Sequence, residues 1–194
     1  MIIHVTGPSG SGKTTLMHKF KSFKSFSVVD TDEIDDKHAM QLYADDKIRD
    51  NITFCNMDPF FKQKDQMNRT WLKTFAKSHK NIIIFGLAFG IIKSADYKFC
   101  IKIDSLVLHT RLQIRTLDAV VAAASEIKKL FKSGVHPELI KFLAIHKYYI
   151  RTDIISPYCP VIDYYDKYYE RMKRHGYQCL EFDVLFRKIE KLLK

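Results

Sequence analysis

The chain has 194 residues, 46% of them hydrophobic and 28% charged, with a formal net charge of +10. This composition is ordinary for one globular domain and does not suggest a disordered chain. The longest apolar run, residues 82–92, contains Gly86 and Gly90 and is about half the ~20 residues that a membrane-spanning helix needs. Residues 2–6 already read as a strand, so we expect no signal peptide and no membrane partner.

The cysteines indicate the cellular compartment, and the charge distribution indicates the kinds of partner. The four cysteines form no C-x-x-C pair, which predicts reduced thiols in a cytoplasmic, reducing compartment. The positive charge fits either a phosphate-rich partner, nucleic acid included, or an ordinary solvated cationic surface. It is unevenly distributed, because residues 30–50 hold eight Asp and Glu residues.

Five short β-branched or aromatic runs predict strands, in chain order Ile2–Thr6, Phe26–Val29, Asn81–Phe85, Phe99–Ile103 and Tyr177–Phe182. Helical periodicity separates them, in Thr14–Phe20, Met67–His79, Leu106–Val121, Tyr164–Met172 and Asp183–Lys194. Arg174 and His175 before Gly176 predict a helix end there. Alternating strands and helices predict an α/β fold, with a parallel sheet covered by helices on both faces.

Two stretches are too long for simple connections between these elements. Residues 33–66 follow the second strand, and residues 122–163 precede the fifth. Within a single domain spanning residues 1–194, we expect the first to be a substrate-binding insertion and the second a lid.

Residues 7–14, Gly-Pro-Ser-Gly-Ser-Gly-Lys-Thr, match the consensus G-x-x-x-x-G-K-[ST] of a phosphate-binding loop, the Walker A motif or P-loop. They lie between an expected strand and an expected helix, which is the context that the motif requires. Glycines allow successive backbone N–H groups to surround an anion, and the helix N-terminus adds positive potential. A simple glycine turn would explain neither Lys13, which would reach the outer phosphates, nor Thr14, whose hydroxyl would hold Mg²⁺.

The second informative segment is Val28-Val29-Asp30-Thr31-Asp32-Glu33-Ile34. Ligands of a parallel sheet gather at the carboxyl ends of its strands, so Asp30 and Asp32 should face the phosphate loop. On an extended segment, residues two apart project to the same side. We expect Asp30 to support the metal and Asp32 to accept a proton from a substrate hydroxyl. The alternative is that Asp32 only caps a helix beginning near Ile34.

With the glycine loop, the "VVDTDEI" segment and the later "RLQIR" segment in this order, the chain resembles the P-loop small-molecule kinases, which include nucleoside monophosphate kinases and shikimate kinases. The resemblance implies a three-layer P-loop NTPase sandwich with a five-stranded parallel sheet in order 2-3-1-4-5. "DTD" is most similar to shikimate kinases, where the residues matching Asp30 and Asp32 support Mg²⁺ and bind the hydroxyl that is phosphorylated. In nucleotide kinases, arginines placed like Arg111 and Arg115 clamp the transferring phosphates; an i, i+4 pair is otherwise a solvated helix face.

The sequence also departs from that family. The strand Ile82–Phe85 lacks the acidic residue of an ordinary Walker B motif, and Gly86-Leu87-Ala88-Phe89-Gly90 matches neither D-G-x-P-R nor a triple glycine. The expected lid has no dense set of arginines and offers Lys128, Lys129, Lys132 and Arg151. GTPase, AAA-type ATPase and serine-hydrolase motifs are absent.

The sequence therefore predicts an ATP-dependent kinase that transfers the γ-phosphoryl group to a small acceptor, a nucleoside or nucleotide in the first instance. Three alternatives stay open: a shikimate-like metabolite kinase, a nucleic-acid 5′-hydroxyl kinase and a non-catalytic nucleotide-binding protein. The expected cofactors are ATP and Mg²⁺. The expected site comprises Gly7, Ser9, Gly10, Ser11, Gly12, Lys13, Thr14 and Thr15 around the nucleotide, Thr14 and Asp30 at the metal, and Lys13, Asp32, Arg111 and Arg115 in catalysis. Neither the acceptor nor the oligomeric state follows from the sequence.

Overall fold

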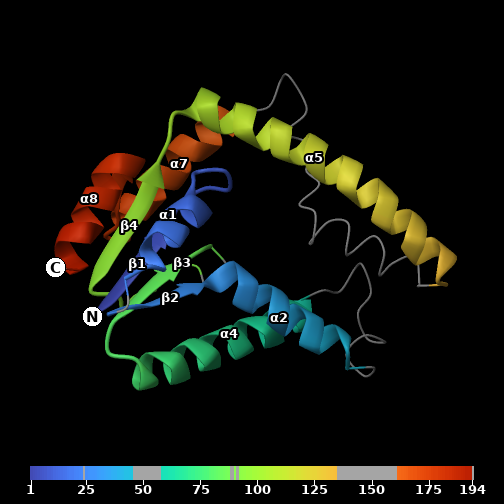
Figure 1. The fold of residues 1–194 in the computed structure, drawn as a ribbon, viewed down its shortest axis with the longest axis horizontal. Coiled ribbons are helices and arrows are strands. Elements are labelled where there is room, and N and C mark those ends of the chain that lie inside the picture. The colour runs from blue at the N-terminus through green and yellow to red at the C-terminus, as the bar shows by residue number, and fades with distance from the viewer. Residues whose placement is uncertain (24, 46–57, 88–89, 91, 135–160, 194) are drawn as a thin grey trace. The chain divides into compact units, whose positions relative to one another are not determined.

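The computed structural model describes residues 1–23, 25–45, 58–87, 90, 92–134 and 161–193 (Figure 1). The chain forms two compact units, Met1–Lys102 together with Tyr169–Lys194, and Ile103–Tyr168. The first unit contains the whole sheet and the glycine loop. No helix among the described residues is both long enough and apolar enough to cross a membrane.

The sheet has five parallel strands in the order β2-β3-β1-β4-β5. This confirms the α/β class and the predicted order 2-3-1-4-5. The strands are β1 (Ile2–Thr6), β2 (Ser27–Asp30), β3 (Ile82–Phe85), β4 (Tyr97–Lys102) and β5 (Gln178–Glu181), and each predicted strand end lies within two residues of the observed one.

The register places the carboxyl ends of the central strands side by side. Phe85 of β3 pairs with Val5 of β1 on one side and with Asp30 of β2 on the other. The segments that leave β1, β2 and β3 therefore start from one edge of the sheet, which is where parallel sheets place their ligands.

Alternate residues of the strands enter two separate cores, because successive strand side chains point to opposite faces. On one face, helices α1 (Lys13–Phe20) and α8 (Phe182–Leu193) cover Ile3, Val5 and Ile83. On the other face, helix α4 (Asp58–Ser78) places Trp71, Leu72 and Phe75 against a cluster made of Val29, Ile82, Ile84 and Ile92.

Helix α7 (Val161–Arg174) ends as its sequence predicts. Gly176 has φ +82°, a left-handed conformation that glycine adopts without strain. The N–H groups of Gly176 and Tyr177 donate to the carbonyls of Lys173 and Met172 at 2.9 and 3.0 Å. These bonds satisfy the last carbonyls of the helix.

The helical content of the two long connections differs from expectation. Helix α2 (Thr31–Tyr43) begins three residues before Ile34, and α4 begins at Asp58, nine residues before Met67. The described part of residues 33–66 is thus mostly helix. Residues 122–132 continue helix α5 (Ser105–Lys132), while residues 46–57 and 135–160 lie outside the described part. The substrate-binding and lid roles of these stretches, and the single-domain reading, stay predictions.

Helix α5 belongs to the second unit. Its N-terminus is capped by Asp104, whose Oδ1 accepts hydrogen bonds from Leu106 and Val107 N–H at 2.9 and 3.1 Å. Leu108, Leu112 and Thr116 are buried at i, i+4 spacing and define its inward face. Arg111 and Arg115 lie on one exposed side of this helix.

A buried histidine sits in the central strand. His4 is 1% exposed, and its Nδ1 lies 2.7 Å from the Tyr177 hydroxyl. Tyr177 accepts a hydrogen bond from Ile92 N–H at 3.3 Å, so its own proton is available to His4. Burial lowers the pKa of His4 to about 4, although a hydrogen bond with the Gly86 backbone opposes that shift. His4 is therefore neutral in the folded protein at neutral pH.

His4 should make folding stability depend on pH. Between the pKa of about 6.5 in the unfolded chain and about 4 in the folded protein, the unfolded state binds a proton that the folded state does not. Above pH 6.5, neutral His4 causes no loss in the free energy of unfolding. As the pH falls below 6.5 the free energy of unfolding decreases, by roughly 3 kcal/mol at pH 4. Urea unfolding between pH 8 and pH 4 measures this slope, which His4→Gln should reduce and the exposed control His18→Gln should not. An unchanged slope in His4→Gln would contradict the assignment.

Candidate functional site

The glycine loop, residues 7–13, connects β1 to α1. Gly10 and Gly12 have φ of +82° and +96°, left-handed values that strain any residue with a Cβ. Ser11 N–H donates to the Pro8 carbonyl at 3.1 Å and closes a tight turn. Backbone bent in this way turns successive N–H groups toward one point, which is the geometry of an anion-binding nest.

The N-terminus of α1 adds to this. Gly12 is its N-cap residue, and no side chain among the described residues caps it. The first turn of α1 contains no acidic residue. The positive potential of this helix end is therefore not offset by a carboxylate in the helix's own first turn.

Lys13 folds back over the loop that precedes it. Its Nζ donates to the Gly7 carbonyl at 2.8 Å and to the Pro8 carbonyl at 3.1 Å. The side chain thus carries its positive charge beside the carbonyls at the start of the glycine loop. This arrangement is suited to an anion with several charges, such as a polyphosphate.

The base of the loop is packed without spare room. A Cβ on Gly7 would lie 2.7 Å from Ser11 Oγ and 3.2 Å from Ile101 Cβ, and a Cβ on Gly12 would lie 3.3 Å from the Phe182 ring. Ser11 Oγ is buried and has no hydrogen-bond partner in the part of the chain that the structure describes. A buried hydroxyl left unsatisfied is costly, and such groups are typical of binding sites.

The remaining predicted loop residues are more accessible. Ser9 and Gly10 are half-buried, and Thr14 and Thr15 are exposed on the first turn of α1. The structure therefore brings the predicted nucleotide residues together in one loop and one helix turn. Their binding roles stay predictions, as does the role of Thr14 at a metal ion.

The structure corrects the expected conformation around Asp30 and Asp32. Asp30 ends β2 and is the N-cap of α2, with its Oδ1 accepting a hydrogen bond from Asp32 N–H at 2.9 Å. Asp32 lies in the first helical turn, so the two carboxylates are not on an extended segment, and Asp32 is not the cap. Asp30-Thr31-Asp32-Glu33 follows the capping pattern of an acceptor followed three residues later by Glu, which explains the early helix start.

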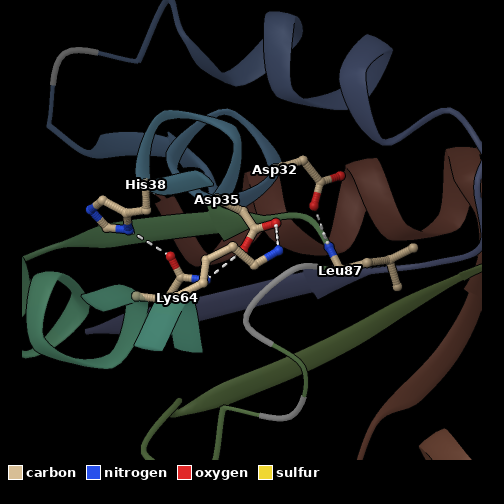
Figure 2. A network of polar contacts seen from close by, with 6 residues as sticks. Asp32, Asp35, His38, Lys64 and Leu87 are labelled. Carbon is tan, nitrogen blue, oxygen red and sulfur yellow. Dashed lines mark hydrogen bonds and ion pairs between the residues drawn. The ribbon is translucent and has the colours of Figure 1, made fainter. Parts of the chain in front are cut away.

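Asp32 connects α2 to the segment that follows β3. Its Oδ1 accepts a hydrogen bond from Leu87 N–H at 2.9 Å, as Figure 2 shows. This bond links residues 55 positions apart in the chain. It fixes one oxygen of the Asp32 carboxylate at the edge where β2 and β3 end.

Gly86 makes this contact sterically feasible. Its φ is +128°, and a Cβ there would overlap Thr31 Oγ1 and lie 2.9 Å from Asp32 Oδ1. Thr31 is fully buried, and its hydroxyl has no hydrogen-bond partner among the described residues. A second unsatisfied buried hydroxyl thus lies at the end of β2, in addition to Ser11 at the end of β1.

A polar network holds α2 against α4 (Figure 2). Lys64 Nζ donates to Asp35 Oδ2 at 2.7 Å, and Asn68 Nδ2 donates to Asp35 Oδ1 at 2.6 Å. Asn68 Oδ1 lies 2.6 Å from His38 Nδ1, and both residues are buried. Since the network joins two helices about 30 residues apart in sequence, it fixes the orientation of the helix that carries Asp32.

The carboxylates at the start of α2 repel one another. Burial raises the pKa of Asp30, and the charges of Asp32 and Glu33 add to that effect against the Asp32 N–H hydrogen bond. Burial followed by the charge of Asp35 raises the pKa of Asp36. A cation or a hydroxyl donor beside these carboxylates would therefore be stabilising.

No protein-family model and no curated protein matches the chain. The described residues contain no group of three or more His, Cys, Asp or Glu side chains arranged to hold a metal ion. Arg111 and Arg115 belong to the second unit, and Arg151 lies outside the described residues. The catalytic role of the arginine pair stays a prediction.

Three contacts of the site join segments that no local sequence pattern brings together. They are the fit of Gly86 against Thr31, the hydrogen bond from Leu87 to Asp32, and the network around Asp35. The capping pattern at Asp30 was a local signal for the start of α2. The other contacts join segments far apart in the chain, and no local pattern indicates them.

Gly86→Ala should destabilise the carboxyl end of the sheet, where β2 and β3 end. The new methyl group would collide with Thr31, and alanine would be strained at the positive φ of this position, so we expect a loss of about 2–4 kcal/mol in the free energy of unfolding. Gly90→Ala is the matched control, because Gly90 has φ +60° but nothing within 4 Å of its Cβ position; it should cost only about 1 kcal/mol. Equal losses in urea unfolding would show that crowding at Gly86 is unimportant.

Proposed function

We propose that the protein is a P-loop phosphotransferase that moves the γ-phosphoryl group of ATP to a small acceptor. The observation that supports this most strongly is the glycine loop between β1 and α1, with the Lys13 ammonium hydrogen-bonded to the Gly7 and Pro8 carbonyls. A loop of this sequence and shape concentrates N–H donors and one cation on a polyphosphate.

The residues at the loop fit ATP and Mg²⁺. The backbone around Gly7, Ser9, Gly10, Ser11 and Gly12 would hold the phosphates, together with Lys13 and the first turn of α1 at Thr14 and Thr15. The buried, unpartnered Ser11 hydroxyl is an observation in favour of this fit. Thr14 and Asp30 would hold Mg²⁺, which, when bound, neutralises phosphate charge during transfer.

The acceptor would bind toward the acidic start of α2. In the strand order, β3 lies between β2, which Asp30 ends, and β1, which the glycine loop follows. Asp32 is oriented by Leu87 N–H and would accept the proton of the acceptor hydroxyl, or orient that hydroxyl, as transfer proceeds. The family resemblance of "DTD" supports the same division of roles.

Three classes of acceptor are candidates. A nucleoside or nucleotide is our first candidate, and a shikimate-like metabolite is favoured by the "DTD" segment. A nucleic-acid 5′ end is favoured by the net charge of +10. Thermal shifts with nucleosides, nucleotides, shikimate and short oligonucleotides, each beside a non-hydrolysable ATP analogue, separate these classes. Nucleic-acid binding would also weaken steeply as salt is raised.

Lys13→Ala should abolish measurable phosphoryl transfer and weaken ATP binding about 10-fold or more, because it removes the only side-chain cation of the loop motif. The fold should persist, since Lys13 contacts loop carbonyls and is only half-buried. Titration with ATP and Mg²⁺ measures the affinity, and far-UV circular dichroism checks the fold. Lys21→Ala, an exposed lysine just after α1, is the control. Wild-type affinity and turnover in Lys13→Ala would contradict the proposal.

Asp32→Asn should separate a kinase from a simple nucleotide-binding protein. Asn keeps an oxygen that can accept from Leu87 N–H, but it loses the charge that a base needs, so transfer should fall by roughly 10²–10⁴-fold. ATP affinity should change little, because the glycine loop holds the nucleotide. Single-turnover transfer and equilibrium ATP binding are the two measurements. Glu33→Gln, an exposed neighbour on the same turn, is the control. Wild-type transfer in Asp32→Asn would exclude the catalytic role.

A further inference from the structure

Two cysteines lie opposite each other on neighbouring strands. Cys100 of β4 and Cys179 of β5 are register partners in a parallel pair, and such partners direct their side chains to the same face of the sheet. Neighbouring strands are about 4.7–4.9 Å apart, which lies within the Cα separations of about 4.4–6.8 Å found in disulfides. In this structure both residues are thiols and not a disulfide.

The two thiols differ in access and in their surroundings. Cys100 is fully buried, whereas Cys179 is half-buried below α7, with its Sγ 3.8 Å from the Tyr169 carbonyl. A hydrogen bond with the Cys100 thiol lowers the pKa of Cys179; burial opposes this shift, and Lys173 reinforces it. The more accessible thiol with the more stable thiolate is the one that an oxidant meets first.

The strands that carry these cysteines also support the glycine loop. Ile101, next to Cys100, packs against Gly7, and Phe182, three residues after Cys179, packs against Gly12. β5 is the last strand in the order of the described sheet, and among the described residues it pairs with β4 alone. A disulfide requires Cys100 Sγ to leave the Ile101 carbonyl, 3.9 Å away, and that same carbonyl would lie 3.3 Å from a Cβ on Gly7.

We propose that Cys100 and Cys179 are a reversible redox pair whose disulfide alters the packing of the glycine loop. Hydrogen peroxide is a sufficient oxidant. The Cys179 thiolate attacks one peroxide oxygen, the O–O bond breaks, and the other oxygen takes a proton and leaves as water. The resulting sulfenic acid is attacked at sulfur by the Cys100 sulfur, the S–O bond breaks, and a second water carries away the Cys100 proton. Two thiols are thereby oxidised to one disulfide, and one peroxide is reduced to two waters.

The test uses the full chain with equimolar hydrogen peroxide. Non-reducing peptide mapping should find the Cys100 and Cys179 peptides joined, with an intact mass lower by two hydrogen atoms. Hydrogen exchange of the peptide covering residues 7–13 should change at least twofold and return to its initial rate with dithiothreitol. Cys179→Ala should lose both effects. A Cys55→Ala, Cys159→Ala double variant, which keeps the pair, should retain them.

Three results would each overturn the proposal. The first is a disulfide that involves other cysteines, and the second is no disulfide at all. The third is a Cys100–Cys179 disulfide that leaves hydrogen exchange in residues 7–13 unchanged. If Cys179→Ala does not fold, alkylation of the reduced wild-type protein with N-ethylmaleimide before peroxide removes the same thiols and must abolish the link. Peptide mapping, intact mass and hydrogen exchange are all measured without a nucleotide. Failure of ATP to bind would therefore contradict the proposed function and leave this proposal decided by its own measurements.

Discussion

The close approach of backbone segments at the carboxyl ends of β1 and β3 is the constraint on which the site depends. Gly86 N–H donates to the Val5 carbonyl at 3.2 Å and extends the pairing of the two strands by one residue. Gly86 and Gly7 then leave the sheet where a Cβ would meet Thr31 or Ser11 at less than ordinary contact distance. Without glycine at both strand ends, the glycine loop and the start of α2 could not lie where the register places them.

The sheet was predictable because its signal is local. Runs such as Ile82–Phe85 are fully buried, and a buried parallel strand is apolar along its whole length. The glycine loop was predictable for the same reason, since its residues are contiguous. For helix α2 only the start was indicated, by a capping residue before a helix near Ile34, because its acidic sequence offers little apolar periodicity. It is held through Asp35, His38 and their partners on α4, and contacts between segments that distant leave no pattern in either segment.

The charges at the carboxyl end of the sheet say more about what could bind there than the net charge of +10 does. After β1 come the glycine loop, the N-terminus of α1 and Lys13, features that favour an anion. After β2 come Asp30, Asp32 and Glu33, and burial together with mutual repulsion raises the pKa of Asp30. The first turn of α2 tolerates these acids because they face the positive end of its own dipole. The carboxyl end of the sheet thus has Lys13 and the N-terminus of α1 after β1, and acidic side chains after β2.

The two unsatisfied hydroxyls lie in this same region. Ser11 Oγ and Thr31 Oγ1 are buried and have no hydrogen-bond partner among the described residues, and each such group costs about 1–3 kcal/mol of stability. Alanine at position 11 or valine at position 31 would avoid that cost at similar volume. One hydroxyl follows β1 and the other follows β2, at the sheet edge where parallel folds bind ligands. Local rules are broken mostly at functional sites, so these two costs at one edge favour ligand binding there over a purely structural role for the glycine loop.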